Sequence, residues 1–169
     1  SDYFGETNLL KNYGEIFLRF REGTYASSDR VGQKSPEFSH KWGEHRFSSD
    51  QLKGQNCLLL FLDERGEFCK QALQIAESVS LQENLTPVIL YIEKQPENIE
   101  NRSGAIILEY TGKTASEYGV TGYPTLFLLD PEGTIRFVKI GYSPLLAEEL
   151  ELAVRQILHD RPIQAQKNK

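Results

Sequence analysis

The sequence has 169 residues, of which 39% are hydrophobic and 25% are charged, and its formal net charge is −5. This composition fits one globular domain with a modest appendage, long enough to bury a sizeable core. Lys and Arg are scattered along the chain and form no run. Because an acidic protein without a basic patch does not offset the repulsion from phosphate groups, we expect no nucleic-acid partner.

No stretch approaches the roughly 20 consecutive apolar residues that span a bilayer. No hydrophobic core of a signal peptide follows Ser1. The sequence contains no methionine, so we expect it to be a processed or truncated piece. A membrane anchor upstream of Ser1 therefore stays open, and the patterns leave the oligomeric state unknown.

Two cysteines, Cys57 and Cys69, are too few for a disulfide scaffold or for a cysteine-based zinc site. The three histidines do not fall at metal-ligand spacing with these cysteines; they are His40, His45 and His159. We expect no metal site and no cofactor.

The first segment, residues 7–20, carries an apolar stripe at helical spacing. The stripe consists of Leu9, Leu10, Tyr13, Ile16, Phe17 and Phe20. It either packs on the surface of the same domain, forms a dimer contact, or leads out of a membrane anchor. Residues 23–34 are rich in Gly, Ser and charge and indicate a linker. We divide the chain into a helix and linker (1–30), a domain (31–160) and a polar tail (161–169).

From residue 31 onward, extended and helical patterns alternate. The predicted strands are 37–41, 45–47, 56–62, 87–92, 125–129 and 134–140, and the predicted helices are 67–83, 113–118 and 144–158. Residues 130–133 (DPEG) form a turn with Pro in the second position and Gly in the fourth. The order predicts an α/β three-layer sandwich with a mixed sheet that is parallel at its centre and carries an antiparallel hairpin.

Residues 118–135 (YGVTGYPTLFLLDPEGTI) closely resemble the cis-proline region of the thioredoxin superfamily. Upstream, residues 31–38 (VGQKSPEF) followed by 52–54 (LKG) are similar to the opening of its TlpA-like and redoxin branches. The resemblance covers about residues 31–158. It implies a thioredoxin-like fold, and the resemblance alone favours an extracytoplasmic location, with membrane anchoring as an open option.

The same resemblance implies that the peptide bond before Pro124 is cis. In the superfamily this loop lies beside the active-site helix, and the backbone of the residue before the proline pairs with a partner polypeptide. The implied polypeptide-binding residues of this chain are Gly122, Tyr123 and Pro124.

The redox motif of the superfamily is incomplete in this chain. Where relatives carry W-C-x-x-C at the start of a helix, residues 65–69 read RGEFC, and aligning Cys69 with the second cysteine puts Gly66 at the nucleophile position. Disulfide exchange needs an attacking thiolate and a thiol that resolves the mixed disulfide. Cys57 lies at the start of a strand whose far end leads to Cys69, and six strand residues span roughly 20 Å. A disulfide between the two cysteines would need their Cα atoms within about 7 Å. We therefore expect two free thiols.

Two main hypotheses follow from this degenerate active site. In the first, the domain binds a polypeptide partner or assists its assembly through the cis-proline face and the Gly66 turn. In the alternative, Cys69 acts as a monothiol thiol-disulfide oxidoreductase. A structural or oligomer-forming role of residues 9–20 is a third possibility. The candidate site consists of Cys69, the active-site-equivalent residues Arg65, Gly66, Glu67 and Phe68, and the polypeptide-binding residues named above.

The reactivity of Cys69 depends on its surroundings. We expect the thiol in the first turn of its helix, where the helix dipole lowers a thiol pKa. Arg65 and Lys70 would lower the pKa further, and neighbouring carboxylates would raise it. The pattern leaves open whether Cys69 is an inert, half-buried thiol or a reactive one.

Overall fold

The computed structural model describes residues 29–42, 44–63, 65–92, 105–108 and 112–159. The predicted N-terminal helix and the polar tail lie outside the described residues, so they remain predictions. Within the described ranges, no helix combines the length and the hydrophobicity that crossing a bilayer requires.

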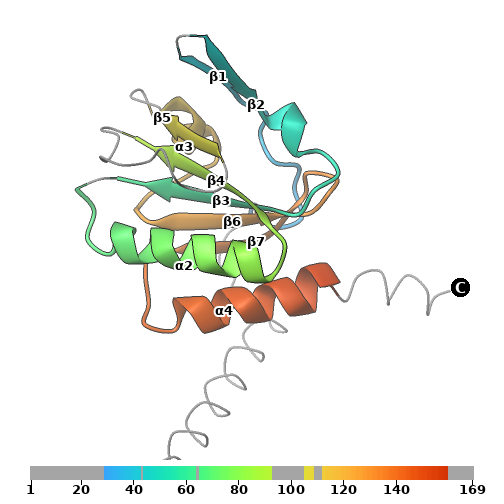
Figure 1. Ribbon diagram of the computed structural model, residues 1–169, viewed down its shortest axis with the longest axis vertical. Coiled ribbons are helices and arrows are strands. Elements are labelled where there is room, and N and C mark those ends of the chain that lie inside the picture. Colours follow the sequence, from blue (N-terminus) through green and yellow to red (C-terminus); the bar gives the residue numbers. More distant parts are fainter. Residues whose placement is uncertain (1–28, 43, 64, 93–104, 109–111, 160–169) are drawn as a thin grey trace, which may run out of the picture.

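A five-stranded mixed sheet forms the middle layer, in the order β5-β4-β3-β6-β7 (Figure 1). Its strands are β3 (Cys57–Leu62), β4 (Thr86–Tyr91), β5 (Ala105–Leu108), β6 (Thr125–Leu129) and β7 (Ile135–Ile140). β3, β4 and β5 are parallel, whereas β6 is antiparallel to both β3 and β7. The predicted mixed sheet is confirmed, with its parallel strands on one side of the antiparallel hairpin.

Helices cover both faces of the sheet, which makes three layers. Figure 1 shows α2 (Cys69–Gln82) and α4 (Leu146–Ala153) together on one face. A π-helical stretch, η2 (Val154–His159), continues α4. The opposite face carries α3 (Lys113–Glu117), the short helix η1 (Ser49–Leu52) and the hairpin of β1 (Ser39–Trp42) and β2 (His45–Ser48). The predicted α/β three-layer sandwich is confirmed.

Side-chain alternation along β3 divides the core into two halves. Leu58, Leu60 and Leu62 pack with α2 and α4, whereas Leu59 and Phe61 pack with α3 and the hairpin. Successive strand residues point to opposite faces, so a continuous apolar run is what a strand covered on both sides requires. Every residue of β3 is buried accordingly.

The sequence pattern does not predict one of the strands, β5. β5 has only four residues, AIIL, and pairs in parallel with β4 from Val88–Ala105 to Tyr91–Leu108. An apolar run this short shows no period that distinguishes a strand from a helix. The predicted order therefore passes from the strand at 87–92 directly to the helix at 113–118.

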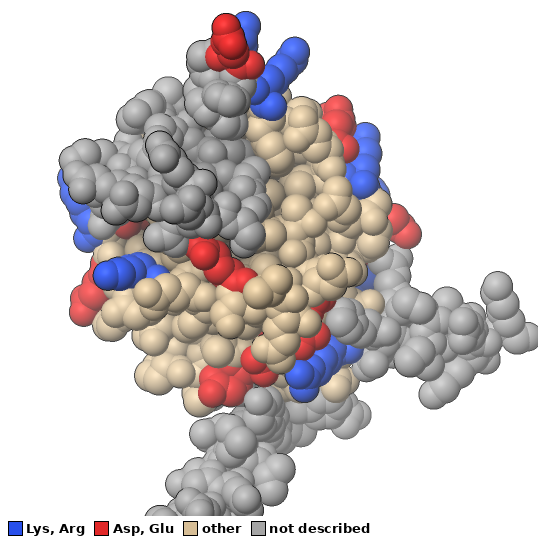
Figure 2. All heavy atoms as spheres, in the orientation of Figure 1, with Lys and Arg blue, Asp and Glu red and all other residues tan. Residues whose placement is uncertain are grey.

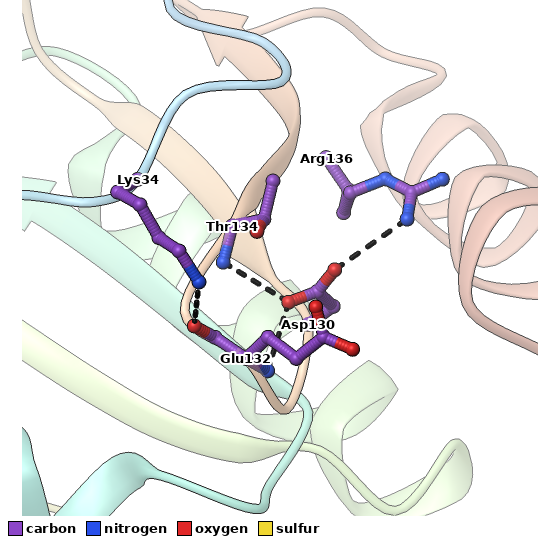
Figure 3. A network of polar contacts seen from close by, with 5 residues as sticks. All are labelled: Lys34, Asp130, Glu132, Thr134 and Arg136. Carbon is purple, nitrogen blue, oxygen red and sulfur yellow. Dashed lines mark hydrogen bonds and ion pairs between the residues drawn. The ribbon is translucent and has the colours of Figure 1, made fainter.

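The predicted turn at 130–133 joins β6 to β7 and fixes the opening segment of the domain (Figure 3). The buried Asp130 carboxylate accepts hydrogen bonds from the backbone N–H groups of Glu132 (2.9 Å) and Thr134 (3.0 Å). Arg136 lies 3.4 Å from the same carboxylate, and Lys34 Nζ donates to the Glu132 carbonyl at 2.8 Å. Because β6 runs from the cis-proline loop to this turn, the network supports the end of the sheet remote from the candidate site.

Candidate functional site

The candidate site lies where β3 ends and β6 begins. The two strands are antiparallel, and Phe61 pairs with Thr125. This register places the loop after Leu62 beside the loop before Thr125. The Tyr123–Pro124 peptide is cis, as the resemblance implied. The Pro124 carbonyl accepts the Gly141 N–H at 2.7 Å, which attaches the end of β7 to the same loop.

Asp63 organises the turn between β3 and α2. Its carboxylate accepts the Arg65 N–H at 2.9 Å, and its carbonyl accepts the Gly66 N–H at 2.8 Å. The Arg65 guanidinium also lies 3.6 Å from the Asp63 carboxylate. Short-range bonds of this kind are the usual way in which Asp closes a turn. The loop is thus held by local contacts of Asp63.

Cys69 lies in the first turn of its helix, as predicted, but α2 begins at Cys69 and not at residue 67, and the residue is only 5% exposed. Burial raises the pKa of the thiol, because a thiolate is poorly solvated there. A hydrogen bond with the Asp63 backbone lowers the pKa, and the negative charge of Asp63 raises it. The net pKa is raised, so the lowering expected from the helix dipole, Arg65 and Lys70 does not prevail.

Gly66 lies directly against the Cys69 sulfur. A Cβ added at Gly66 would lie 2.7 Å from Cys69 Sγ and 3.1 Å from the Asp63 carbonyl oxygen. Gly66 is not among the glycines with positive φ. The position aligned with the family nucleophile therefore faces the remaining cysteine, and the absence of a side chain leaves room for the thiol.

Phe68 has an unusual backbone and an exposed ring. Its φ of 67° and ψ of 2° are left-handed, which is a genuine outlier for a bulky residue. The side chain is 42% exposed, and the ring stacks on Tyr142 with a centroid distance of 4.7 Å and an interplanar angle of 10°. We call this pair the aromatic platform. Tyr142 was missed by the sequence analysis, because only the pairing of β7 with the cis-proline loop brings it here.

The cis-proline loop presents one open position. Around Gly122, nothing lies within 4 Å of where a Cβ would be. Its carbonyl accepts the Thr125 hydroxyl at 2.6 Å. Tyr123 is half-buried and packs against both halves of the core, and Pro124 is buried.

The structure thus places the sequence-predicted residues on two neighbouring segments: residues 65–69, which end at the start of α2, and the loop at 122–124. Of these residues, Arg65, Glu67 and Phe68 are exposed.

No protein-family model matches the sequence, and neither does any curated protein. Solved structures do match. One is a candidate DsbE thiol:disulfide interchange protein from Chlorobium tepidum, with a TM-score of 0.68, 20% identity and coverage of 76% of this chain and 98% of that one. The chain has the thioredoxin fold.

Two further structures of this fold are similar. The thioredoxin domain of a thiol-disulfide oxidoreductase from Bacteroides vulgatus has a TM-score of 0.61 and 16% identity, and the match covers 76% of this chain and 98% of that one. A secreted disulfide oxidoreductase from Mycobacterium tuberculosis, homologous to DsbE, has a TM-score of 0.56 and 18% identity, with 66% and 89% covered. The resemblance stated from the sequence is confirmed at the level of the fold, and the structural relatives are thiol:disulfide oxidoreductases.

The other cysteine of this thioredoxin-fold domain lies away from the candidate site. Cys57 begins β3, is 1% exposed, and its thiol donates to the Leu52 carbonyl at 3.7 Å. Burial raises the pKa of Cys57 to about 12. Both cysteines are free thiols, as predicted.

The described residues contain no group of three or more His, Cys, Asp or Glu side chains placed to hold a metal ion. Charges are also dispersed: Figure 2 shows Lys and Arg interspersed with Asp and Glu among the coloured residues of the face in view.

Proposed function

We propose that this thioredoxin-fold domain binds an extended polypeptide segment along the cis-proline loop and the Gly66 turn, and does not itself exchange disulfides. The observation that carries the proposal is the pairing of a retained cis-proline loop with a buried Cys69, whose side chain is 5% exposed. The loop keeps the element that, according to the superfamily resemblance, pairs with a partner polypeptide. The thiol beside it lacks the exposure that attack on a disulfide requires.

The chemistry of exchange would need two thiols at this place. Gly66 supplies none, and Cys57 sits at the opposite end of β3. A mixed disulfide formed at Cys69 would therefore have no local thiol to resolve it. Binding needs no such partner, because it uses the backbone and the surface of the two loops.

The alternative is a monothiol oxidoreductase that uses Cys69. It is favoured by the fold, which the chain shares with thiol:disulfide oxidoreductases, and by the place of Cys69 at the start of α2. It requires that the turn at 63–68 open, since the thiol is buried and its pKa is raised.

Gly122 offers a direct test of binding. A Cβ at this position meets nothing within 4 Å, and Gly122 has no positive φ, so the side chain of Gly122→Gln starts in open space on the proposed face. Leu81→Gln is the matched control, since Leu81 is 85% exposed near the end of α2. The probe is fluorescently labelled insulin B chain with its cysteines carboxymethylated, measured by anisotropy.

We expect Gly122→Gln to weaken binding of this probe at least about fivefold, whereas Leu81→Gln and Cys69→Ala bind like the original chain. Absence of binding by the original chain, or equal binding by Gly122→Gln, would overturn the proposal.

The alternative is separated by treating the native protein with oxidised glutathione and measuring its mass. The proposal predicts that no glutathione adduct forms at Cys69 until the protein is denatured. A rapid adduct in the native state, together with loss of probe binding in Cys69→Ala, would favour the monothiol enzyme.

A further inference from the structure

Phe68 holds an aromatic ring in solvent at the edge of the candidate site. Among the large hydrophobic side chains that the structure shows as exposed, Phe68 is the aromatic one; the others are Val31, Leu81 and Ile140. Its left-handed backbone, with φ of 67°, is costly for a residue with a Cβ. Such outliers persist where the surrounding structure holds them, and they cluster at ligand-binding sites.

Tyr142 supports one face of this ring. The two rings are nearly parallel, at 10°, with centroids 4.7 Å apart, and Phe68 remains 42% exposed. Stacking on Tyr142 covers one face of the Phe68 ring, and the exposure that remains is available to a ligand. Aromatic pairs favour offset-stacked or edge-to-face contacts with further aromatic rings.

The aromatic platform is tied to the cis-proline loop through the backbone. Gly141, the residue before Tyr142, donates its N–H to the Pro124 carbonyl at 2.7 Å. On the other side of Tyr142, the Ser143 hydroxyl donates to Glu149 Oε1 at 2.9 Å. Tyr142 is therefore fixed between the loop that would hold a polypeptide backbone and the first turn of α4.

We infer that the aromatic platform, Phe68 with Tyr142, receives an aromatic side chain of the bound polypeptide. This inference rests on the proposed function and names the side-chain class that the site prefers. In an extended segment, alternate side chains share a face and recur about every 6.6 Å. The Gly141–Pro124 hydrogen bond puts Tyr142 beside the cis-proline loop, so a segment held by this loop brings one of its side chains to the platform. The exposed ring of Phe68 offers that side chain a stacking partner.

The experiment uses the full 169-residue chain labelled with ¹⁵N and titrated with short peptides, followed by amide chemical shifts. The peptides consist of Gly, Ser and Thr and differ only in a central Phe, Ala or Lys. We expect the Phe peptide to bind at least about threefold more tightly than the Ala peptide. Both should shift the amides of Gly122 and Tyr123, and the Phe peptide should also shift those of Phe68 and Tyr142.

Phe68→Ala should remove the preference for the Phe peptide, so that this variant binds the Phe and Ala peptides with equal affinity. Phe68→Gly should do the same, and its backbone accepts a positive φ without strain. Leu81→Ala, which removes an exposed apolar side chain elsewhere, should keep the preference.

The possible outcomes distinguish a failure of this inference from a failure of the proposed function. Peptides that bind equally well at Gly122 and Tyr123, whatever their central residue, would overturn the inference and leave the proposed function standing. A Lys peptide that binds more tightly than the Phe peptide would overturn it as well. If no peptide shifts the cis-proline loop, the proposed function fails and the inference fails with it.

Discussion

Lys139 and Glu149 form an ion pair across the joint between β7 and α4, with Nζ 3.2 Å from Oε2. The two side chains are only 17% and 6% exposed. The other carboxylate oxygen of Glu149 accepts the Ser143 hydroxyl. One carboxylate therefore holds the strand, the helix and the connecting loop that carries Tyr142. Its place in the first turn of α4 is also favourable for a negative charge.

Glu149→Gln should lower the free energy of unfolding by about 3 kcal/mol, because it removes the negative charge that faces the largely buried Lys139 ammonium. Urea denaturation followed by circular dichroism measures the change. Lys53→Gln is the control, since its partner Asp50 and Lys53 itself are about two-thirds exposed (67% and 70%), and it should leave the midpoint where it was. Equal midpoint shifts in the two variants would show that the Lys139–Glu149 pair stabilises the fold no more than the exposed Lys53–Asp50 pair does.

Two variants of Phe68 distinguish the cost of its backbone strain from the stabilisation by ring stacking. Phe68→Ala loses the stacking on Tyr142 but keeps a Cβ at a φ of 67°, so it should be less stable than the original chain by about 1 kcal/mol. Phe68→Gly also loses the ring, yet glycine accepts a positive φ, so it should be about 1 kcal/mol more stable than Phe68→Ala. Denaturant midpoints of the two variants give the comparison. A glycine variant less stable than the alanine variant would contradict the strained backbone.

The sequence predicted what long, periodic segments and the thioredoxin resemblance determine. β3 was visible because both of its faces are buried, which makes an unbroken apolar run. The cis-proline loop was visible because its flanking residues carry a specific pattern. β5 was not, since four apolar residues have no readable period.

The candidate site was predictable only in part, for a physical reason. Gly66, Phe68 and Cys69 are close in the sequence, so an alignment brings them together. The contact between Phe68 and Tyr142 joins residues 74 positions apart and depends on the register of β6 and β7. The pKa of Cys69 is likewise raised, chiefly by burial. Burial cannot be read from the local sequence, whereas the nearby charges can.

Cys57 should make the stability of the fold fall at alkaline pH. Its folded pKa is raised to about 12, from an ordinary thiol value of 9.0. Between these values, the unfolded chain loses the thiol proton while the folded chain keeps it. Stability from the buried neutral thiol is therefore full below about pH 9 and declines as the pH rises, by at most about 1.4 kcal/mol per pH unit.

Cys57→Ala isolates this contribution. The variant should be less stable than the original chain at pH 8, and the difference in unfolding free energy should shrink between pH 9 and pH 10.5. Subtracting the two chains removes the titration of every group that they share. A difference that stays constant with pH would mean that Cys57 does not hold a raised pKa.

Gly66→Ala should destabilise the domain by about 1–3 kcal/mol, because its Cβ would lie 2.7 Å from Cys69 Sγ, closer than unbonded atoms tolerate. The double variant with Cys69→Ala removes the sulfur, so the cost of the Gly66 substitution should be much smaller in that background. Thermal unfolding of the four chains gives the coupling energy. Equal costs in both backgrounds would place the Gly66 Cβ away from the thiol.

Because of the same short distance, the thiol of Gly66→Cys should form a covalent bond with Cys69. Across a disulfide, the Cβ of one cysteine and the sulfur of the other lie about 3 Å apart, given an S–S bond of about 2.05 Å. The 2.7 Å between the added Cβ and Cys69 Sγ is close to this value, and the backbone of Gly66 has no positive φ to exclude a side chain. We expect a 66–69 disulfide to form with oxidised glutathione, detected as a loss of two free thiols and of two mass units relative to the reduced variant.

The same variant should gain disulfide-reductase activity toward insulin in the presence of dithiothreitol, because the new thiol lies just before α2, where the helix N-terminus stabilises a thiolate. The activity should be weak, since Arg65 and Phe68 stand where relatives carry other neighbours. Gly66→Ser has a similar volume without a thiol and should show neither the disulfide nor the activity. A folded Gly66→Cys variant whose thiols at 66 and 69 stay reduced would show that Cys69 does not correspond to the second cysteine of the family motif.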